Sequence, residues 1–255
     1  MRDDIIHFWD LLWGMTEKEL RARYKNTVFG FLWILVNPIL QMLVIGFIFA
    51  FFLKEPIEHY YFYLFAGLLI WNFFSLSLSK ATPSIVYERN LIKKAVFPRS
   101  VIPLSIIASN MIHFLLALLL YAIPVLFLGT LDVYRLPYLM LGFFQLIGFT
   151  VGLCLLTSSL NVRFRDINFF VQAALIVWFY ATPIVYSIAF VPYRFIWLWR
   201  LNPLTSTVQI FQYGFLGAPP PGPFMLTANF VVIVIVLILG IITFRREGKN
   251  FDDWV

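Results

Sequence analysis

The most regular feature of the chain is a series of six long apolar stretches. Each is about as long as a bilayer-spanning helix, because a hydrocarbon core of roughly 30 Å needs about 20 residues. None of the six contains Asp, Glu, Lys or Arg, and one such charge at mid-helix would cost roughly 2.5–3.5 kcal/mol. The pattern predicts an all-α integral membrane protein with six transmembrane helices, over residues 28–53, 60–79, 101–128, 137–160, 167–187 and 224–244.

The segments between these stretches differ in their content of Lys and Arg. Fifteen basic residues lie in residues 1–26, in the connections after the second and fourth stretches, and in the tail 245–255. Cytoplasmic segments are enriched in basic residues, so we expect both termini in the cytoplasm. The other side of the membrane then receives only four basic residues, which are Lys54, Arg135, Arg194 and Arg200.

The N-terminal segment has helical periodicity but is too charged to span a membrane. We expect an amphipathic helix in the membrane interface, with two Trp side chains at headgroup depth. The Thr-x-x-Glu pattern from Thr16 to Glu19 predicts the cap of a second helix that leads towards the first span. A positively charged anchor and a docking surface for a cytoplasmic partner are both open as its role. The apolar residues at helical spacing are Ile5, Phe8, Trp9, Leu12 and Trp13.

The basic connection over residues 80–100 is expected to contact another protein. Pro98 biases the residue before it away from helix, so a short helix should end ahead of it. Several apolar side chains lie beside basic ones here, and exposed apolar groups need a cover. A solvated basic loop is the alternative. The apolar residues are Leu91, Ile92, Val96 and Phe97, and the basic ones are Arg89, Lys93 and Lys94.

The stretch 188–223 is long for a loop and still rich in apolar residues. It predicts two short re-entrant helices, over 196–200 and 204–216, that are separated by a break at Asn202 and Pro203. Re-entrant backbone needs burial in protein or a water-filled cavity, so this segment suggests an outer gate. The Pro-rich residues 218–223 would then form a stiff connection to the last span.

Composition and motifs exclude several classes of function. Only 13% of the 255 residues are charged, whereas a soluble domain carries about a quarter. Basic cytoplasmic loops explain the net charge of +6 better than nucleic-acid binding does. A G-x-x-x-x-G-K-[ST] motif is missing from the sequence, so we do not expect this chain to bind ATP by a P-loop.

Metal, disulfide and acid–base chemistry lack the residues that they need. Cys154 is the single cysteine, which excludes an intramolecular disulfide. The three His residues fall in separate segments, so we expect no metal site, and no carboxylates pair within the predicted spans. His113, near Asn110, is an ionisable residue inside a span and therefore a candidate for function. A neutral His bonded to a neighbouring helix is the favoured interpretation.

Aromatic residues are abundant, with 29 Phe, 12 Tyr and 8 Trp. Most of them suit lipid contact, helix packing or interfacial belts. Some would suit the wall of a wide path, because aromatic rings offer area without fixed charge to the C–H faces of sugars. The candidates for such a lining are Trp33, Trp71, Phe74, Phe170, Trp178 and Tyr180.

Five segments together resemble one family of membrane proteins. Residues 20–33 (LRARYKNTVFGFLW), which are followed by Asn37 and Pro38, resemble the start of the first span in type-2 ABC exporter permeases. The similarity is narrower to polysaccharide and polyol-phosphate exporters, which include O-antigen, capsule and teichoic-acid permeases. The other matching segments are 90–99 (NLIKKAVFPR), 161–166 (NVRFRD), 182–187 (TPIVYS) and 202–205 (NPLT).

The resemblance implies a single transmembrane domain over residues 1–255, located in the bacterial inner membrane, that works as a homodimer. It also implies two copies of a separate cytoplasmic ABC ATPase that hold ATP and Mg, so that this chain carries no cofactor of its own. The cargo would be a glycan linked to undecaprenyl diphosphate, with Arg21, Arg23 and Lys25 near its headgroup. The implied ATPase-coupling residues are Glu88, Arg89, Asn90, Leu91, Ile92, Lys93, Lys94, Phe97, Arg163 and Arg165.

Three other functions stay open at this stage. A type-2 ABC permease for a teichoic acid, a lipid or a drug would share the fold. A membrane-bound glycosyl or acyl transferase would need an acid, His or metal cluster at the interface, which the sequence lacks. A passive channel or structural subunit would have no ATPase partner.

Overall fold

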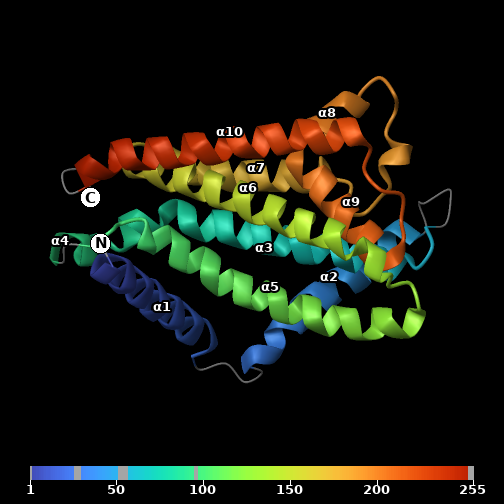
Figure 1. Ribbon diagram of the computed structural model, residues 1–255, viewed down its shortest axis with the longest axis horizontal. Helices are drawn as coiled ribbons and strands as arrows, with labels where there is room; N and C mark the ends of the chain where they lie inside the picture. Colours follow the sequence, from blue (N-terminus) through green and yellow to red (C-terminus); the bar gives the residue numbers. More distant parts are fainter. Residues whose placement is uncertain (1, 26–29, 51–56, 95–96, 252–255) are drawn as a thin grey trace.

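The computed structural model describes residues 2–25, 30–50, 57–94 and 97–251, and the regular elements in these ranges are all helical (Figure 1). In chain order they are α1 (Arg2–Tyr24), the 3-10 helix η1 (Gly30–Leu32), α2 (Trp33–Ala50), α3 (Tyr60–Tyr87), α4 (Arg89–Lys94), α5 (Val101–Leu128), η2 (Val133–Arg135), α6 (Leu136–Arg163), α7 (Asp166–Tyr180), η3 (Ile188–Phe190), α8 (Ile196–Leu201), α9 (Pro203–Leu216), α10 (Pro223–Glu247) and η4 (Gly248–Asn250).

The long helices lie side by side, and the two ends of the bundle differ in charge. One end carries α4, the start of α5 and the last turn of α10 with Arg245 and Arg246. We call it the basic end, and we call the other the opposite end. The N- and C-terminal parts of the chain both lie at the basic end (Figure 1).

Helix α3 forms the centre of the bundle. Within its most apolar window, 72% of the residues are buried inside the chain, against 28% for α5 and 22% for α10. It packs against α2, α5, α6, α7 and α9. Phe74 of α3 stacks on Phe149 of α6 at 5.6 Å between ring centroids and meets Trp178 of α7 edge-on at 5.3 Å. The surrounding helices therefore shield α3, and α5 and α10 keep broad apolar faces on the outside.

Four of the predicted spans are helices that are long and apolar enough to cross a bilayer. In the described part of the chain they are α3, α5, the stretch of η2 with α6, and α10. Helix α5 has the predicted bounds. Helices α2 and α7 match the first and fifth predicted spans but are shorter, so the count of six stays a prediction. Residues 28–29 and 51–53 of the first predicted span lie outside the described residues.

The prediction that the fifth helix extends to residue 187 is wrong, because α7 ends at Tyr180. The backbone N–H of Ala181 donates to the carbonyl of Val177 at 3.0 Å and caps the last turn. Pro183 has no N–H to continue the helix, and it biases Thr182 away from helical geometry. The 15 residues of α7 rise about 23 Å, which is less than a bilayer core of roughly 30 Å.

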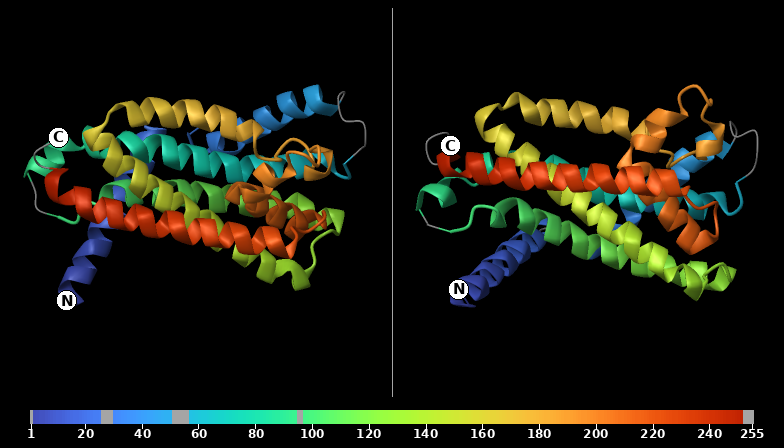
Figure 2. Two further views of the ribbon diagram at one scale, coloured as in Figure 1. Left: turned by 90° about the horizontal axis from the view of Figure 1, so that it is seen from above. Right: turned by 45° about the horizontal axis from the view of Figure 1, so that its top comes forward.

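The predicted break between two N-terminal helices is also wrong, because α1 is one helix of 23 residues. Instead of capping a new helix, the hydroxyl of Thr16 donates to the carbonyl of Leu12 at 2.7 Å, a bond that hydroxyls form inside helices. Helix α1 packs against α5, while Trp9 and Trp13 are exposed. Its N-terminal part stands away from the bundle (Figure 2). The location of α1 in a membrane interface stays a prediction.

The two short helices predicted between the last spans are present as α8 and α9, with the break at Asn202. Helix α9 is buried over most of its length and packs against α3, α6 and α10. It ends at Gly217, whose φ of 72° favours glycine. Whether the pair dips into a membrane stays a prediction.

Helices α6 and α10 cross with their backbones in close contact at Gly152 and Gly240. A Cβ atom on Gly240 would lie 2.2 Å from the carbonyl oxygen of Gly152, and a Cβ on Gly152 would lie 2.8 Å from the Cα of Leu237. Small residues allow such close contact between two backbones. In lipid the hydrophobic effect does not drive helices together, so van der Waals packing of this kind contributes to their association.

We expect the Gly240→Ala substitution to destabilise the protein, because the methyl group forces α10 away from α6. Overpacking of this kind costs about 1–3 kcal/mol, so the melting temperature in detergent should fall by roughly 2–10 °C. Gly14→Ala in α1 is the matched control, since no atom lies within 4 Å of the added Cβ. Equal melting temperatures of the two variants would contradict the tight crossing.

Candidate functional site

A cavity of about 580 Å³ lies between the end of α1 and helices α2, α3 and α5. Its walls combine two cationic side chains with amides, a histidine and aromatic rings. Such a mixture suits a ligand that has an anionic part and a polar or sugar-like part. The main lining residues are Arg23, Trp33, Asn37, Gln41, Trp71, Asn72, Phe73, Ser75, Lys80, Asn110, His113 and Phe114.

Arg23 is fixed in this cavity by two side chains of α5. Its Nη2 donates to Oδ1 of Asn110, and its Nη1 lies 2.5 Å from Nδ1 of His113. The amide nitrogen of Asn110 donates in turn to Oγ of Ser77 in α3 at 3.1 Å. A guanidinium group only donates hydrogen bonds, so Nδ1 of His113 must accept this one. Nδ1 therefore carries no proton, and the imidazole ring is neutral. The sequence prediction of a neutral His bonded to a neighbouring helix agrees with this geometry.

The described lining of the cavity carries a net positive charge. Arg23 and Lys80 both line it, and its described lining residues include no Asp or Glu. The amide of Asn72 donates to Oε1 of Gln41 at 3.0 Å, so polar groups of α2 and α3 continue along the wall. Electrostatic attraction is stronger here than in water, because the surrounding helices lower the effective dielectric constant.

The three predicted headgroup residues do not lie together. Arg21 pairs with Glu17 on the surface of α1, and its side chain is 80% exposed. Lys25 is exposed and does not line the cavity. Arg23 alone of the three reaches the cavity, while Lys80, which the headgroup prediction missed, lines it too. Position on α1 explains the separation, because residues two apart face different sides of a helix.

The basic end presents a set of exposed cationic side chains on α4. Arg89, Asn90, Lys93 and Lys94 are exposed there. Just before α4, Glu88 accepts from Nζ of Lys18 in α1 at 2.6 Å and joins the two helices. At the next connection, Arg163 and Arg165 are exposed, and the guanidinium of Arg163 lies 5.1 Å from the centroid of the Phe164 ring.

The expectation that the apolar residues of this connection need an external cover is wrong for Ile92, and for Leu91 and Phe97 it stays a prediction. Ile92 is only 4% exposed, and it packs with Ile85, Ile102 and Phe244 in a second hydrophobic cluster. Phe97 packs against the same cluster, and Leu91 is half-buried. Val96 lies outside the described residues. The chain therefore buries Ile92 itself, which gives α4 an anchor in a cluster built from α3, α5, α6 and α10.

Residues 10–216 match the family described as ABC-2 type transporter. The chain belongs to this family. Three curated relatives carry the name O-antigen export system permease protein RfbA. One from Klebsiella pneumoniae is 33% identical over 99% of this chain and 98% of its own length. A second from the same species is 33% identical over 95% of this chain and 91% of its own. One from Myxococcus xanthus is 30% identical over 96% and 95%.

The six aromatic residues predicted to line a path fall into three groups in this ABC-2 chain. Trp33 and Trp71 line the cavity. Phe74 and Trp178 pack against each other in the core, with Phe74 fully buried and Trp178 half-buried, and their role as a lining stays a prediction. Phe170 and Tyr180 are 71% and 63% exposed on α7, and no cavity described here has them in its lining. Hydrophobic periodicity does not separate these groups, because all three surroundings are apolar.

At the opposite end, Asn202 joins the end of α7 to the start of α9. Its Oδ1 accepts from Nε1 of Trp178 at 3.0 Å and from the backbone N–H of Leu204 at 3.1 Å. Its Nδ2 donates to the carbonyl of Ala181 at 3.2 Å and to Oγ1 of Thr182 at 3.0 Å. One amide therefore caps two helices. The Asn-Pro pair in the sequence indicated the break but not these partners.

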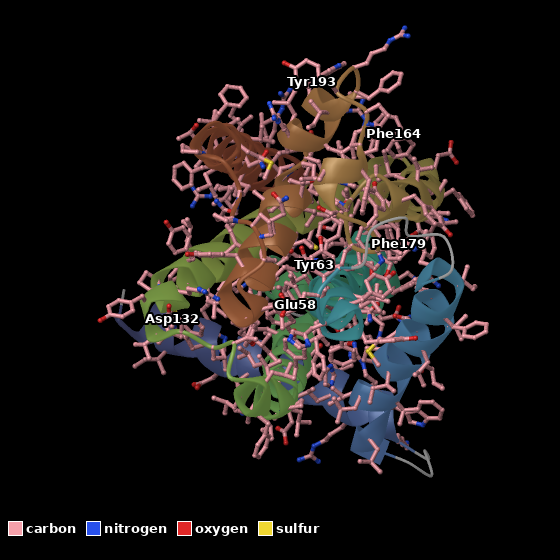
Figure 3. The ribbon with its side chains drawn as sticks, turned by 90° about the vertical axis from the view of Figure 1, so that its right-hand side faces the viewer. Glu58, Tyr63, Asp132, Phe164, Phe179 and Tyr193 are labelled. Atoms are coloured by element: carbon pink, nitrogen blue, oxygen red, sulfur yellow. The ribbon has the colours of Figure 1, made fainter. Side chains whose placement is uncertain are left out.

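Further bonds tie α9 and its neighbours to α3. Gln212 of α9 donates to the carbonyl of Tyr63 at 3.3 Å, and the hydroxyl of Tyr60 donates to the carbonyl of Val185 at 3.0 Å. Figure 3 looks along the bundle from this end and shows Tyr63 near the middle, with Asp132 and Tyr193 at the periphery. The segment that follows α7 thus packs over the end of α3 in this structure.

We expect Asn202→Ala to weaken the opposite end, because it leaves the indole of Trp178 and the end of α7 without their partner. An unsatisfied buried polar group costs about 1–3 kcal/mol, so the melting temperature should fall by roughly 2–10 °C. Thr227→Ala removes an exposed hydroxyl of α10 that bonds only within its own helix and serves as the control. A fall no larger than that of the control would exclude the double-capping role.

Proposed function

We propose that this chain is the membrane permease of an exporter that moves lipid-linked polysaccharide of the O-antigen type out of the cytoplasm. The cavity around Arg23 and Lys80 is the observation that carries this proposal, since it combines cations with amides and aromatic rings. A diphosphate and the first sugars of a glycan need these groups. The names of three relatives that match nearly the whole chain support the same substrate.

The proposal places the basic end on the cytoplasmic side. Most of the chain's basic residues lie in segments that α4, the end of α6 and the end of α10 bring to that end, and cytoplasmic loops are basic. The N- and C-terminal parts of the chain lie there together (Figure 1). In a bacterium this membrane is the inner membrane, where lipid-linked glycans are available on the cytoplasmic face.

Energy would come from two copies of a separate ABC ATPase on the cytoplasmic side, with ATP and Mg bound there. Helix α4 is the proposed contact, because it offers exposed Lys93 and Lys94 on a seat packed into the chain's own core. Arg163 and Arg165 at the end of α6 would join this surface. Two permease chains would form the path between them, so that the exposed aromatics of α7 face a second copy or lipid.

Export would proceed in three steps. Cations of the cavity hold the diphosphate at the cytoplasmic side, and the glycan lies along Trp33 and Trp71. Nucleotide binding then shifts α4 and the helices packed on it, which requires two states of the bundle that nucleotide biases. At the opposite end, movement of α8 and α9, proposed as re-entrant helices, would release the sugar chain.

The lining of the cavity also bears on other substrates of the exporter. A teichoic acid shares the anionic linker, so only its polymer distinguishes it. A hydrophobic drug would gain nothing from two cations and several amides. A transferase reaction would need an acid or a metal, and the described residues contain no group of His, Cys, Asp and Glu that could hold a metal ion.

We expect Arg23→Gln to weaken binding of a lipid-linked oligosaccharide by about 10- to 100-fold, since a hydrogen bond to a charged group is worth about 1.5–3 kcal/mol. Binding of a fluorescent undecaprenyl-diphosphate oligosaccharide to the purified chain measures this. Arg21→Gln, which removes the same charge from the outer face of α1, should bind within a factor of about two, in keeping with an exposed ion pair. An equal loss of oligosaccharide affinity in the two variants would contradict the proposed role of the cavity.

We expect Lys93→Glu combined with Lys94→Glu to uncouple ATP hydrolysis from export, because the charge reversal removes the contact while the seat of α4 is unchanged. The measurement compares ATP hydrolysis and glycan transport in vesicles that contain both subunits. Arg194→Glu at the opposite end is the control. Normal transport by the double variant would remove α4 from the coupling mechanism.

A further inference from the structure

A groove of about 590 Å³ runs between the start of α5 and the end of α10, with α6 as its floor. It lies on a different face of α5 from the cavity around Arg23. Figure 2 shows α5 and α10 next to each other at the basic end, with α6 crossing between them. The proposed export function does not use this groove, so it requires its own explanation.

The mouth of the groove at the basic end is cationic. Arg99, Arg245 and Lys249 line it. Nη1 of Arg99 donates to the carbonyl of Gly248 at 2.6 Å, which bridges the two sides of the groove. Arg245 and Lys249 are exposed and make no ion pair with any residue in the described part of the chain. An anionic group at the mouth would therefore meet two available cations.

The inner part of the groove is apolar. Leu104, Val151, Leu155 and Ile241 line it, and the neighbouring Ile238 and Ile242 form part of the exposed apolar surface of α10. From Ile241 to Lys249 the helix rises about 12 Å, which is close to the depth of one leaflet of a hydrocarbon core of roughly 30 Å. The groove thus has the polarity profile of half a bilayer: charged at the helix ends and apolar further in.

We propose that this groove binds one anionic phospholipid from the leaflet at the basic end. Its phosphate would lie between Arg245 and Lys249, and an acyl chain would follow Leu104, Leu155 and Ile241. Charge complementarity favours an acidic headgroup over a zwitterionic one, because the ammonium group of a zwitterionic headgroup would be repelled by the basic mouth of the groove. The apolar inner part of the groove favours a lipid over free phosphate, because free phosphate has no acyl chain to fill it.

Occupation of the groove would stabilise the seat of α4. Phe97 lines the groove and also packs against the cluster that contains Ile92 of α4. A lipid that fills the space between α5 and α10 holds the start of α5 and the end of α10 at a fixed separation. The lipid would then act as a structural ligand of the basic end and would be separate from the exported molecule.

Native mass spectrometry of the full chain, titrated with phosphatidylglycerol or with phosphatidylcholine, tests this proposal. We expect phosphatidylglycerol to bind more tightly and to raise the melting temperature. Arg245→Gln and Lys249→Gln should each weaken its binding about fivefold, since one cation near a membrane surface is worth about a factor of five. Arg246→Gln removes the same charge beside the groove and should change binding by less than about twofold.

A second variant tests the apolar part of the site. Leu104→Trp fills the groove without changing its charge and should reduce lipid binding while Arg23-dependent glycan binding persists. The proposal fails if phosphatidylcholine binds equally well, or if Arg246→Gln weakens binding as much as Arg245→Gln. It also fails if inorganic phosphate stabilises the chain as much as phosphatidylglycerol does, or if Leu104→Trp binds phosphatidylglycerol normally.

Discussion

The surroundings of an apolar bundle leave a polar side chain few partners, so hydrogen bonds inside the protein stabilise it strongly. Hydroxyls meet this requirement locally, as when Thr82 and Thr150 donate to carbonyls four residues earlier in their own helices. A guanidinium group needs several hydrogen-bond acceptors, and Arg23 finds two of them on Asn110 and His113 of α5. This bond fixes the end of α1 about nine residues into α5, or roughly 14 Å from its start. Arg23, near the end of α1, therefore forms part of the cavity wall.

The same requirement shapes the opposite end by different means. Helix α7 stops short of a full span, and its last carbonyl would be left without a donor in lipid. The hydroxyl of Tyr186 donates to that carbonyl, and Asn202 donates to the next one, that of Ala181, while it accepts from Trp178. Because Trp178 also packs on Phe74 and Phe149, the amide connects this end to the aromatic centre of the bundle. The end of the short α7 is thus tied to the start of α9.

The sequence predicted what depends on local pattern and missed what depends on partners. Spans without charge were readable from composition alone, and α5 has the bounds that its apolar run predicts. Pro98 and Asn202 indicated breaks because backbone geometry at such residues is local. The burial of Ile92 was not readable, since the cluster that buries it includes Phe244 of the last helix. Likewise, Arg21 and Arg23 are equivalent in the sequence, and only the packing of α1 against α5 separates them. The prediction of a helix start at Thr16 failed because a Thr hydroxyl can either cap a helix or donate to a carbonyl of the preceding turn within a helix.

Helix α1 connects the two regions to which we assign the first steps of export. Lys18 bonds Glu88 at the junction of α3 and α4, and Arg23, five residues further on, bonds His113 in the cavity. These two positions on α1 are about 7.5 Å apart along one rigid helix. A shift of α4 that carries Glu88 with it would therefore move the end of α1, and Arg23 would leave or approach Asn110. Because Ile92 anchors α4 in the second hydrophobic cluster, the proposed push on its exposed lysines would be passed on to the helices of that cluster. The proposed motor contact and the proposed anion site would then be connected through one helix, which the sequence alone presented as a simple anchor or docking surface.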